Sequence, residues 1–187
     1  MAELLEKPKI GSMSVEEFWE SGLYRTHELI DGQPVEKMPA VFDHGEIILI
    51  VGNAIRAHVK KHKLGRVSTD ALFLFHPEEK IRAPDVSFVS NAALIGQNTA
   101  KFVDVAPTLA VEVMSQNDKQ SEMEEKAEFY LAHGSLEVWN IHPATQAVEV
   151  FRRGQEPKVY VLSAGDEIPG GDVLPGFSLP LKEIFED

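Results

Sequence analysis

Two long segments of the chain carry apolar residues at helical spacing. From Asp43 to His62 the apolar positions recur at helical intervals, and basic residues gather towards the end of the segment, where a helix dipole favours them. The stretch from Asp118 to His133 has a similar pattern and is closed by Gly134, a residue typical of helix ends. These segments predict the two long helices of the protein.

Short apolar runs before and after the second helix predict strands. Arg66 to Phe75 and Ala83 to Val89 are expected to form neighbouring strands, separated by a polar turn at Pro77 to Lys80. The run Leu109 to Met114 is apolar except for one residue, which is typical of a central strand buried on both faces. Leu136 to Ile141 is expected to be another buried strand.

The beginning of the chain predicts two smaller elements. Ser14 and Glu17 have the spacing of a capping box, so a short helix is expected to begin here and to end at Gly22. The segment Arg25 to Met38 contains Asp31-Gly32, a two-residue hairpin turn signal, and predicts a small antiparallel hairpin.

The region after Ala144 predicts antiparallel additions to the sheet. Val148 to Arg152 and Lys158 to Leu162 have the composition of strands, and the tail through Pro180 is rich in Gly and Pro. The sequence therefore predicts one α/β domain over residues 1–187, with a mixed central β-sheet flanked by helices and extra antiparallel hairpins.

Composition restricts the possible chemistry of the site. The 187 residues are 43% hydrophobic, which suffices for one core, and contain no cysteine, which excludes thiolate metal sites and cysteine nucleophiles. The first residues, Met1 to Ile10, lack the apolar stretch of a secretion signal, and no segment approaches the roughly 18 apolar residues of a membrane span. A cytoplasmic protein with no membrane partner is expected.

Net charge is the main argument against a nucleic-acid substrate. With 18 Lys and Arg against 30 Asp and Glu, the chain carries −12, whereas phosphate backbones are bound by cationic groups. Two basic clusters are present, and each is either a local contact for a polyanion or a solvated face. Their residues are Arg56, Lys60, Lys61, Lys63 and Arg66 in the first, and Arg152, Arg153 and Lys158 in the second.

Two carboxylates stand out because their neighbours are apolar. Asp85 follows Pro84 at the start of a predicted strand, and it either accepts turn amide hydrogen bonds or binds a ligand. Glu112 lies inside the apolar run Leu109 to Met114, where an unpaired charge would cost several kcal/mol. Glu112 therefore needs a partner, which is either a salt-bridging cation or a divalent metal shared with Asp85.

The second long helix supplies a third candidate. In a helical projection Lys126 lies at the edge of the apolar stripe, next to Met123 and Tyr130. A lysine at this position either extends to water or meets a carboxylate on the adjacent strand, for which Glu112 is the obvious candidate.

A series of short motifs occurs in order along most of the chain. They are Glu28-Leu29-Ile30-Asp31-Gly32, His44 at a helix start, Pro84-Asp85-Val86, Val111-Glu112-Val113-Met114-Ser115, Lys126 with Tyr130, Gly134 and Glu137-Val138-Trp139-Asn140-Ile141-His142-Pro143. Their order and spacing over residues 14–180 resemble the Uma-two family of restriction-endonuclease-like proteins.

This resemblance implies a PD-(D/E)XK nuclease core, a magnesium-type metal and a site built from Asp85, Glu112 and Lys126. Two positions depart from the expected patterns. The usual nuclease motif has a lysine two residues after the glutamate, where this chain has Met114, so the cation is expected from Lys126. The last strand of the family tends to end in aspartate, where this chain has His142.

The chemistry that fits these residues is metal-assisted hydrolysis of phosphodiester bonds in nucleic acid, with DNA as the expected substrate. Asp85, Glu112 and the backbone carbonyl of Val113 would hold one Mg²⁺ or Mn²⁺. Glu28 and His44 are accessory candidates, either around the metal or as substrate contacts. Lys126 would orient water or neutralise developing charge.

Two other functions remain open at this point. The chain could be a catalytically silent nuclease fold used for protein interaction or dimerisation, or a hydrolase of a small phosphorylated ligand. A homodimer is expected because the hairpin at Glu28 to Met38 and the later antiparallel strands leave sheet edges that a partner could cover.

Overall fold

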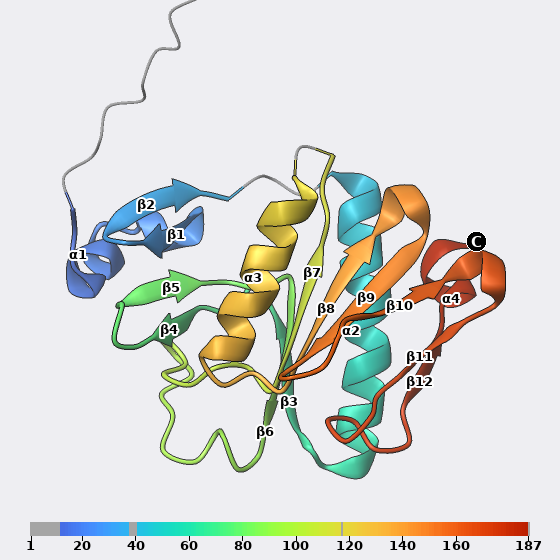
Figure 1. Ribbon diagram of the computed structural model, residues 1–187. Coiled ribbons are helices and arrows are strands. Elements are labelled where there is room, and N and C mark those ends of the chain that lie inside the picture. The colour runs from blue at the N-terminus through green and yellow to red at the C-terminus, as the bar shows by residue number, and fades with distance from the viewer. Residues whose placement is uncertain (1–11, 38–40, 117, 187) are drawn as a thin grey trace, which may run out of the picture.

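A six-stranded mixed sheet with the order β10-β9-β8-β7-β6-β3 forms the middle layer of the computed structural model, which describes residues 12–37, 41–116 and 118–186 (Figure 1). In this order the strands are Lys158–Val161, Ala147–Arg152, Glu137–His142, Leu109–Val113, Val86–Ser90 and Gly65–Thr69. Only β7 and β8 pair in parallel among these strands; the other neighbours are antiparallel.

Strand β7 lies inside this sheet, and all five of its residues are buried. The prediction of a central strand at Leu109 to Met114 is therefore confirmed. Strand β8 is also buried along its whole length, which confirms the second predicted buried strand. The connection between these two parallel strands runs through a helix, as parallel pairing requires.

Helices α2 (Phe42–His62) and α3 (Gln120–Ala132) cover opposite faces of the sheet. Successive side chains of β7 alternate between the two faces. Val111 and Val113 pack with α2, whereas Ala110 packs with Ala127 of α3. Glu112 therefore points towards α3. The two predicted helices and their packing on the central sheet are confirmed.

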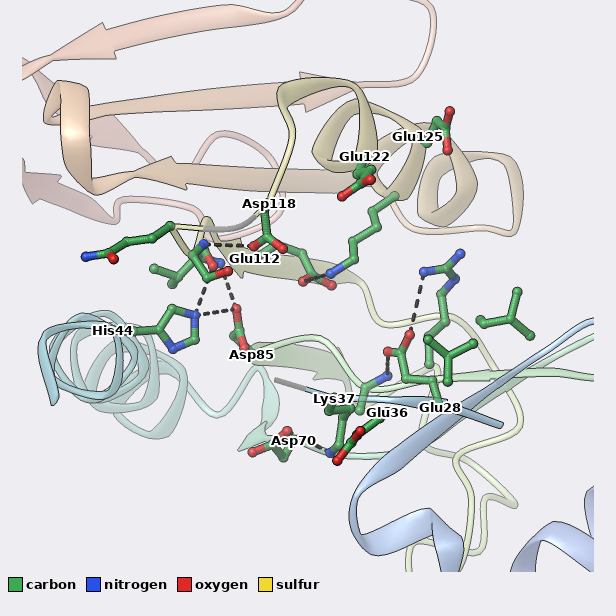
Figure 2. A pocket seen from close by; sticks show the side chains of 18 of the residues that line it. Glu28, Glu36, Lys37, His44, Asp70, Asp85, Glu112, Asp118, Glu122 and Glu125 are labelled. Atoms are coloured by element: carbon green, nitrogen blue, oxygen red, sulfur yellow. Dashed lines mark hydrogen bonds and ion pairs between the residues drawn. The ribbon is translucent and has the colours of Figure 1, made fainter. Parts of the chain in front are cut away.

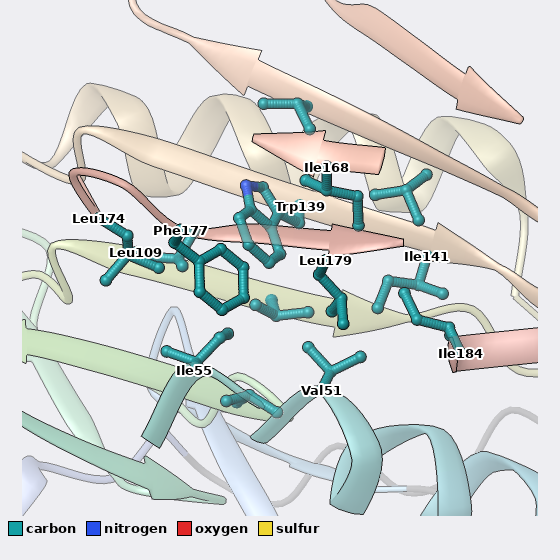
Figure 3. Close-up of a cluster of buried hydrophobic side chains, with 14 of the residues drawn as sticks. Val51, Ile55, Leu109, Trp139, Ile141, Ile168, Leu174, Phe177, Leu179 and Ile184 are labelled. Atoms are coloured by element: carbon teal, nitrogen blue, oxygen red, sulfur yellow. The ribbon is translucent and has the colours of Figure 1, made fainter. Parts of the chain in front are cut away.

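The α2 face of the sheet holds the largest hydrophobic cluster (Figure 3). Trp139 from β8 is fully buried in this cluster, which also includes Val51 and Ile55 of α2. The C-terminal elements complete this layer. They are β11 (Glu167–Pro169), β12 (Ser178–Pro180) and α4 (Lys182–Phe185), and Ile168, Leu179 and Ile184 are their main buried residues.

A second sheet of four short strands, ordered β2-β1-β5-β4, stands beside the main sheet. Its strands are Gln33–Glu36, His27–Ile30, Lys80–Arg82 and Phe73–Phe75. The predicted N-terminal hairpin forms β1 and β2, and it turns at Asp31 and Gly32, whose φ angles are 50° and 72°. Met38, the predicted end of this hairpin, is outside the described residues. The predicted helix is α1 (Val15–Glu20), with its capping box at Ser14 and Glu17.

The structure corrects two predicted strands, because the first is divided between the two sheets and the second begins later than predicted. Arg66 to Phe75 forms β3 and β4, and Ala83 to Val89 contributes only its second half, β6, to the main sheet. Asp70 adopts a left-handed conformation with φ of 51°, which turns the chain out of the strand. The preceding strand β5 ends at Arg82.

The register shows that these two segments remain partners across the break. Thr69 pairs with Val86 in the main sheet, and Phe73 pairs with Arg82 in the small sheet, which is the same antiparallel register on both sides. Pro84 lies in the interruption and has no N–H group to donate to a ladder. The break therefore leaves the residue after Pro84 at the junction of the two sheets.

The described part of the chain contains no helix long and apolar enough to cross a membrane.

Candidate active site

Asp85 occupies the junction between the two sheets, one residue before β6 begins. Val86 pairs with Val111 of β7, so the same register brings Asp85 beside Glu112. The Oδ2 atom of Asp85 accepts a hydrogen bond of 2.7 Å from the Val113 backbone N–H. The strand break and the neighbouring strand together place the two carboxylates at one end of the sheet.

Glu112 is held on the α3 face by two donors from that helix. Lys126 Nζ donates to Oε2 at 2.9 Å, and the Tyr130 hydroxyl donates to Oε1 at 2.8 Å. The side chain of Glu112 is only 5% exposed, and that of Lys126 is 30% exposed. The predicted contact between Lys126 and Glu112 is present.

His44 approaches the carboxylates from the first turn of α2 on the opposite face. Its Nε2 atom lies 2.9 Å from the Val113 carbonyl oxygen and 3.6 Å from Asp85 Oδ2. His44 therefore lies next to the proposed site. Within the described residues its Nδ1 atom is buried and has no hydrogen-bond partner.

Glu28 enters the site from strand β1 of the small sheet. Its Oε1 atom accepts a 2.8 Å hydrogen bond from the Ala83 backbone N–H, and its Oε2 atom lies 3.7 Å from Arg82 Nη1. Burial and, to a smaller extent, the charge of Glu112 raise the pKa of the Glu28 carboxyl. Glu28 thus fixes the segment that leads to Asp85.

These side chains open into a pocket of about 500 Å³ whose walls come from both sheets, α2 and α3. Figure 2 shows its labelled residues around the two central carboxylates. Eight acidic residues line the pocket, against the cationic Lys37, Arg82 and Lys126 and the imidazole of His44. The acidic set is Glu28, Glu36, Asp70, Asp85, Glu112, Asp118, Glu122 and Glu125. The pocket therefore has an excess of negative charge.

The two neighbouring carboxylates, Asp85 and Glu112, affect the protonation of the site. Burial and, next, the negative charge of Glu112 raise the pKa of Asp85 to about 8. The carboxylate of Glu112 raises the pKa of Lys126, so this lysine remains charged. One ammonium group thus faces two carboxylates, and Asp85 retains its proton near neutral pH.

This donor set fits a hard divalent cation. Mg²⁺ and Mn²⁺ prefer carboxylate and carbonyl oxygens, and Mg²⁺ usually keeps several waters. Asp85, Glu112 and Val113 all line the pocket, where their carboxylate and carbonyl groups would offer three such oxygens. In the described residues no three His, Asp or Glu side chains form a ligand group, so a cation here would rest on two carboxylates, a carbonyl and water.

Tyr130 is the residue of the site that sequence patterns missed. Its place in the apolar stripe of α3 indicated only packing, and its ring is indeed fully buried. A buried tyrosine hydroxyl usually needs a hydrogen-bond partner, however, and the nearest predicted buried acceptor was Glu112. The need of the Tyr130 hydroxyl for a partner was the sequence signal that could have placed this residue in the site. In the structure the hydroxyl donates to Glu112.

Replacing Tyr130 by phenylalanine removes only this hydroxyl. We expect Tyr130→Phe to destabilise the protein by about 1.5 kcal/mol, because a buried carboxylate loses one charge-assisted hydrogen bond. Urea denaturation measures the effect, and Tyr160→Phe, at a buried tyrosine of β10, serves as the control. Equal stability of Tyr130→Phe and wild type would show that the hydroxyl does not support Glu112.

The corner at His142 lies apart from the pocket lining. Its Nε2 atom pairs with Glu149 Oε2 at 3.0 Å, and its Nδ1 atom lies 3.3 Å from the sulfur of Met114. The two positions that depart from the expected patterns, Met114 and His142, therefore contact each other, and neither lines the pocket.

The basic cluster on α2 also lies away from the site. Lys60 is 16 residues after His44, which corresponds to about 24 Å along an α-helix. Arg56, Lys60 and Lys61 are exposed, as on a solvated helix face. The structure thus favours the solvated-face interpretation for this cluster.

The fold is that of a solved nuclease-type structure. A crystal structure of a protein described as a "putative nuclease belonging to DUF820", from Anabaena variabilis, matches with a TM-score of 0.74 and 23% sequence identity. The match covers 85% of this chain and 89% of that chain. At this identity the likeness establishes the fold, and the predicted fold class is confirmed.

The family follows from the sequence itself. The Uma2 family model, described as "Putative restriction endonuclease", matches residues 16–182. The chain therefore belongs to the Uma2 family, which confirms the resemblance found in the motifs. No curated protein matches the chain.

Proposed function

We propose that the protein is a metal-dependent endonuclease that hydrolyses phosphodiester bonds of nucleic acid, with DNA as the expected substrate. The observation that carries this proposal is the pair of carboxylates formed by the partly buried Asp85, just before β6, and the buried Glu112 of β7, beside Lys126. Membership of a family of restriction-endonuclease type supports the nuclease class. We further propose that the protein acts in the cytoplasm.

The mechanism assigns one role to each residue. Asp85, Glu112 and the Val113 carbonyl would hold Mg²⁺ or Mn²⁺, which would supply Lewis-acid polarisation of the phosphate and a more acidic water. Lys126, already hydrogen-bonded to Glu112, would place its ammonium group near the developing negative charge. His44 would position the Val113 carbonyl, and Glu28 would position the Ala83 backbone next to Asp85.

A nuclease assay with Mn²⁺ on mixed polynucleotides tests the proposed function. Wild type should cut the substrates, chelation should stop the reaction, and Asp85→Ala should be inactive. Activity that survives in Asp85→Ala would contradict the assigned site. A wild type that binds no divalent metal would instead favour a catalytically silent interaction module.

The homodimer remains a prediction from the sheet edges. Strands β3 and β10 are the two edges of the described main sheet, and β3 is largely exposed. A second copy could cover such an edge, which otherwise offers unpaired backbone groups to any chain. Light scattering at micromolar concentration should give twice the mass of the 187-residue chain. A monomeric mass would contradict the prediction.

A further inference from the structure

The hairpin β1–β2 presents two different faces to its surroundings. Leu29 points into a small core with Phe18 and Ile81. Glu28 and Val35 are direct cross-strand partners, so they share the opposite face, and both line the pocket. The hairpin is therefore one wall of the pocket, held in place by the core behind it.

This wall is partly apolar: Glu28 and Glu36 of the hairpin are acidic, whereas Ile30 and Val35 are apolar. Ile30, Val35, Val41 and Ala83 line the pocket, and Val35 is 47% exposed and Val41 63% exposed. Phosphate groups and metal ions gain nothing from contact with such apolar side chains. The flat face of a nucleobase, in contrast, packs favourably against them. Base faces are stacked inside a duplex and become accessible only in an unpaired strand.

The depth and charge of the pocket favour an unpaired strand as well. Glu112 is almost buried, and the walls around it come from the hairpin, the start of α2 and the start of α3. A duplex carries one negative charge per about 1.7 Å of its axis, twice the density of one strand. With eight acidic residues in the lining, the pocket repels a duplex more strongly than one strand.

We propose that the pocket accepts one unpaired nucleotide of a polynucleotide strand and excludes base-paired duplex. The phosphodiester faces Asp85 and Glu112, and the base lies against Ile30, Val35 and Val41. A volume of about 500 Å³ is in the range of pockets that enclose one small ligand. This inference rests on the proposed nuclease function and names the substrate class of that site.

Three substrates of one sequence test the strand preference: a single strand, a fully paired duplex, and a duplex with a short unpaired bulge. In Mn²⁺ we expect cleavage of the single strand at least about tenfold faster than of the duplex, and cleavage of the third substrate at its bulge. Equal cleavage of the paired duplex would overturn this inference but leave the nuclease function intact. Absence of cleavage on all three substrates would overturn both.

A matched pair of variants tests the apolar wall. Val35→Ser should raise the KM for the single strand about fivefold with little change in kcat, because the base loses an apolar contact while the carboxylates remain. Val159→Ser on β10 is the control, since Val159 is 51% exposed on an edge strand outside the pocket. An unchanged KM in Val35→Ser, or an equal rise in both variants, would overturn the assignment of the wall.

Discussion

Asp85→Asn is expected to abolish divalent-metal binding and to lower hydrolysis by at least about three orders of magnitude, while making the apo protein more stable. Asparagine keeps an oxygen that can accept the 2.7 Å hydrogen bond from the Val113 N–H. It removes a group that, on folding, must either place a second charge beside buried Glu112 or take up a proton. Calorimetric titration with Mn²⁺ and thermal melts measure the two effects.

The gain in stability has a definite dependence on pH. Burial and the charge of Glu112 raise the pKa of Asp85 from 3.8 to about 8, so the folded protein holds this proton more tightly than the unfolded chain does. Wild-type stability contributed by this group is therefore lost as the pH rises from about 4 to about 8. Asparagine does not titrate, and the advantage of Asp85→Asn should grow over the same interval.

Asp166→Asn is the matched control for this experiment. Asp166 Oδ2 also accepts a backbone hydrogen bond, 2.8 Å from the Val161 N–H, but it does not line the pocket. The control should bind metal like wild type. An Asp85→Asn protein that binds Mn²⁺ with unchanged affinity, or that is less stable than wild type at pH 8, would refute the assignment of Asp85.

Sequence patterns predicted the elements whose signals are local. The apolar run at Leu109 to Met114 is typical of a strand covered on both faces, and the structure places it inside the sheet. Lys126 was expected either to extend to water or to meet Glu112, because it lies at the edge of the apolar stripe of its helix. In the structure Lys126 Nζ, on the helix, lies 2.9 Å from Glu112 Oε2, on the strand. The need of a buried carboxylate for a cation therefore predicted a contact between two separate elements.

The parts that patterns missed depend on tertiary arrangement. Nothing in the composition of Arg66 to Phe75 indicated that this run would form two strands, β3 and β4, in different sheets. Pro84 was the available signal, because a proline is unfavourable inside a continuous paired strand. The junction that results is what brings Asp85 to Glu112. The acidic character of the pocket was also hidden, because its lining residues come from positions between Glu28 and Lys126.

Glu137 shows that a buried glutamate by itself does not define a site. It lies in β8, is fully buried, and accepts hydrogen bonds from Arg152 Nε at 2.7 Å and from Trp139 Nε1 at 2.5 Å. Its cation comes from the neighbouring strand β9, and the group does not line the pocket. What distinguishes Glu112 is the second carboxylate beside it and the opening in front of it.

The ion pairs Lys126–Glu112 and Arg152–Glu137 are similar in burial, so Arg152 provides a matched control for the role of Lys126. The side chains of Lys126 and Arg152 are 30% and 25% exposed, and each is the cation of a buried glutamate. Lys126→Met and Arg152→Met should each lower the free energy of unfolding by about 3 kcal/mol, because each leaves a buried carboxylate without its cation. Urea denaturation of the two variants measures this shared structural cost.

The two variants should then differ in chemistry. Both should still bind Mn²⁺, since neither residue is a proposed ligand, but only Lys126→Met should lose hydrolysis by several orders of magnitude, as expected when an electrostatic stabiliser of the transition state is removed. Activity is measured below the melting temperature of both variants, so that unfolding contributes equally. If Lys126→Met retains the activity of Arg152→Met, Lys126 is only the structural partner of Glu112. If, in addition, wild type cuts no polynucleotide, the fold serves as a silent interaction module.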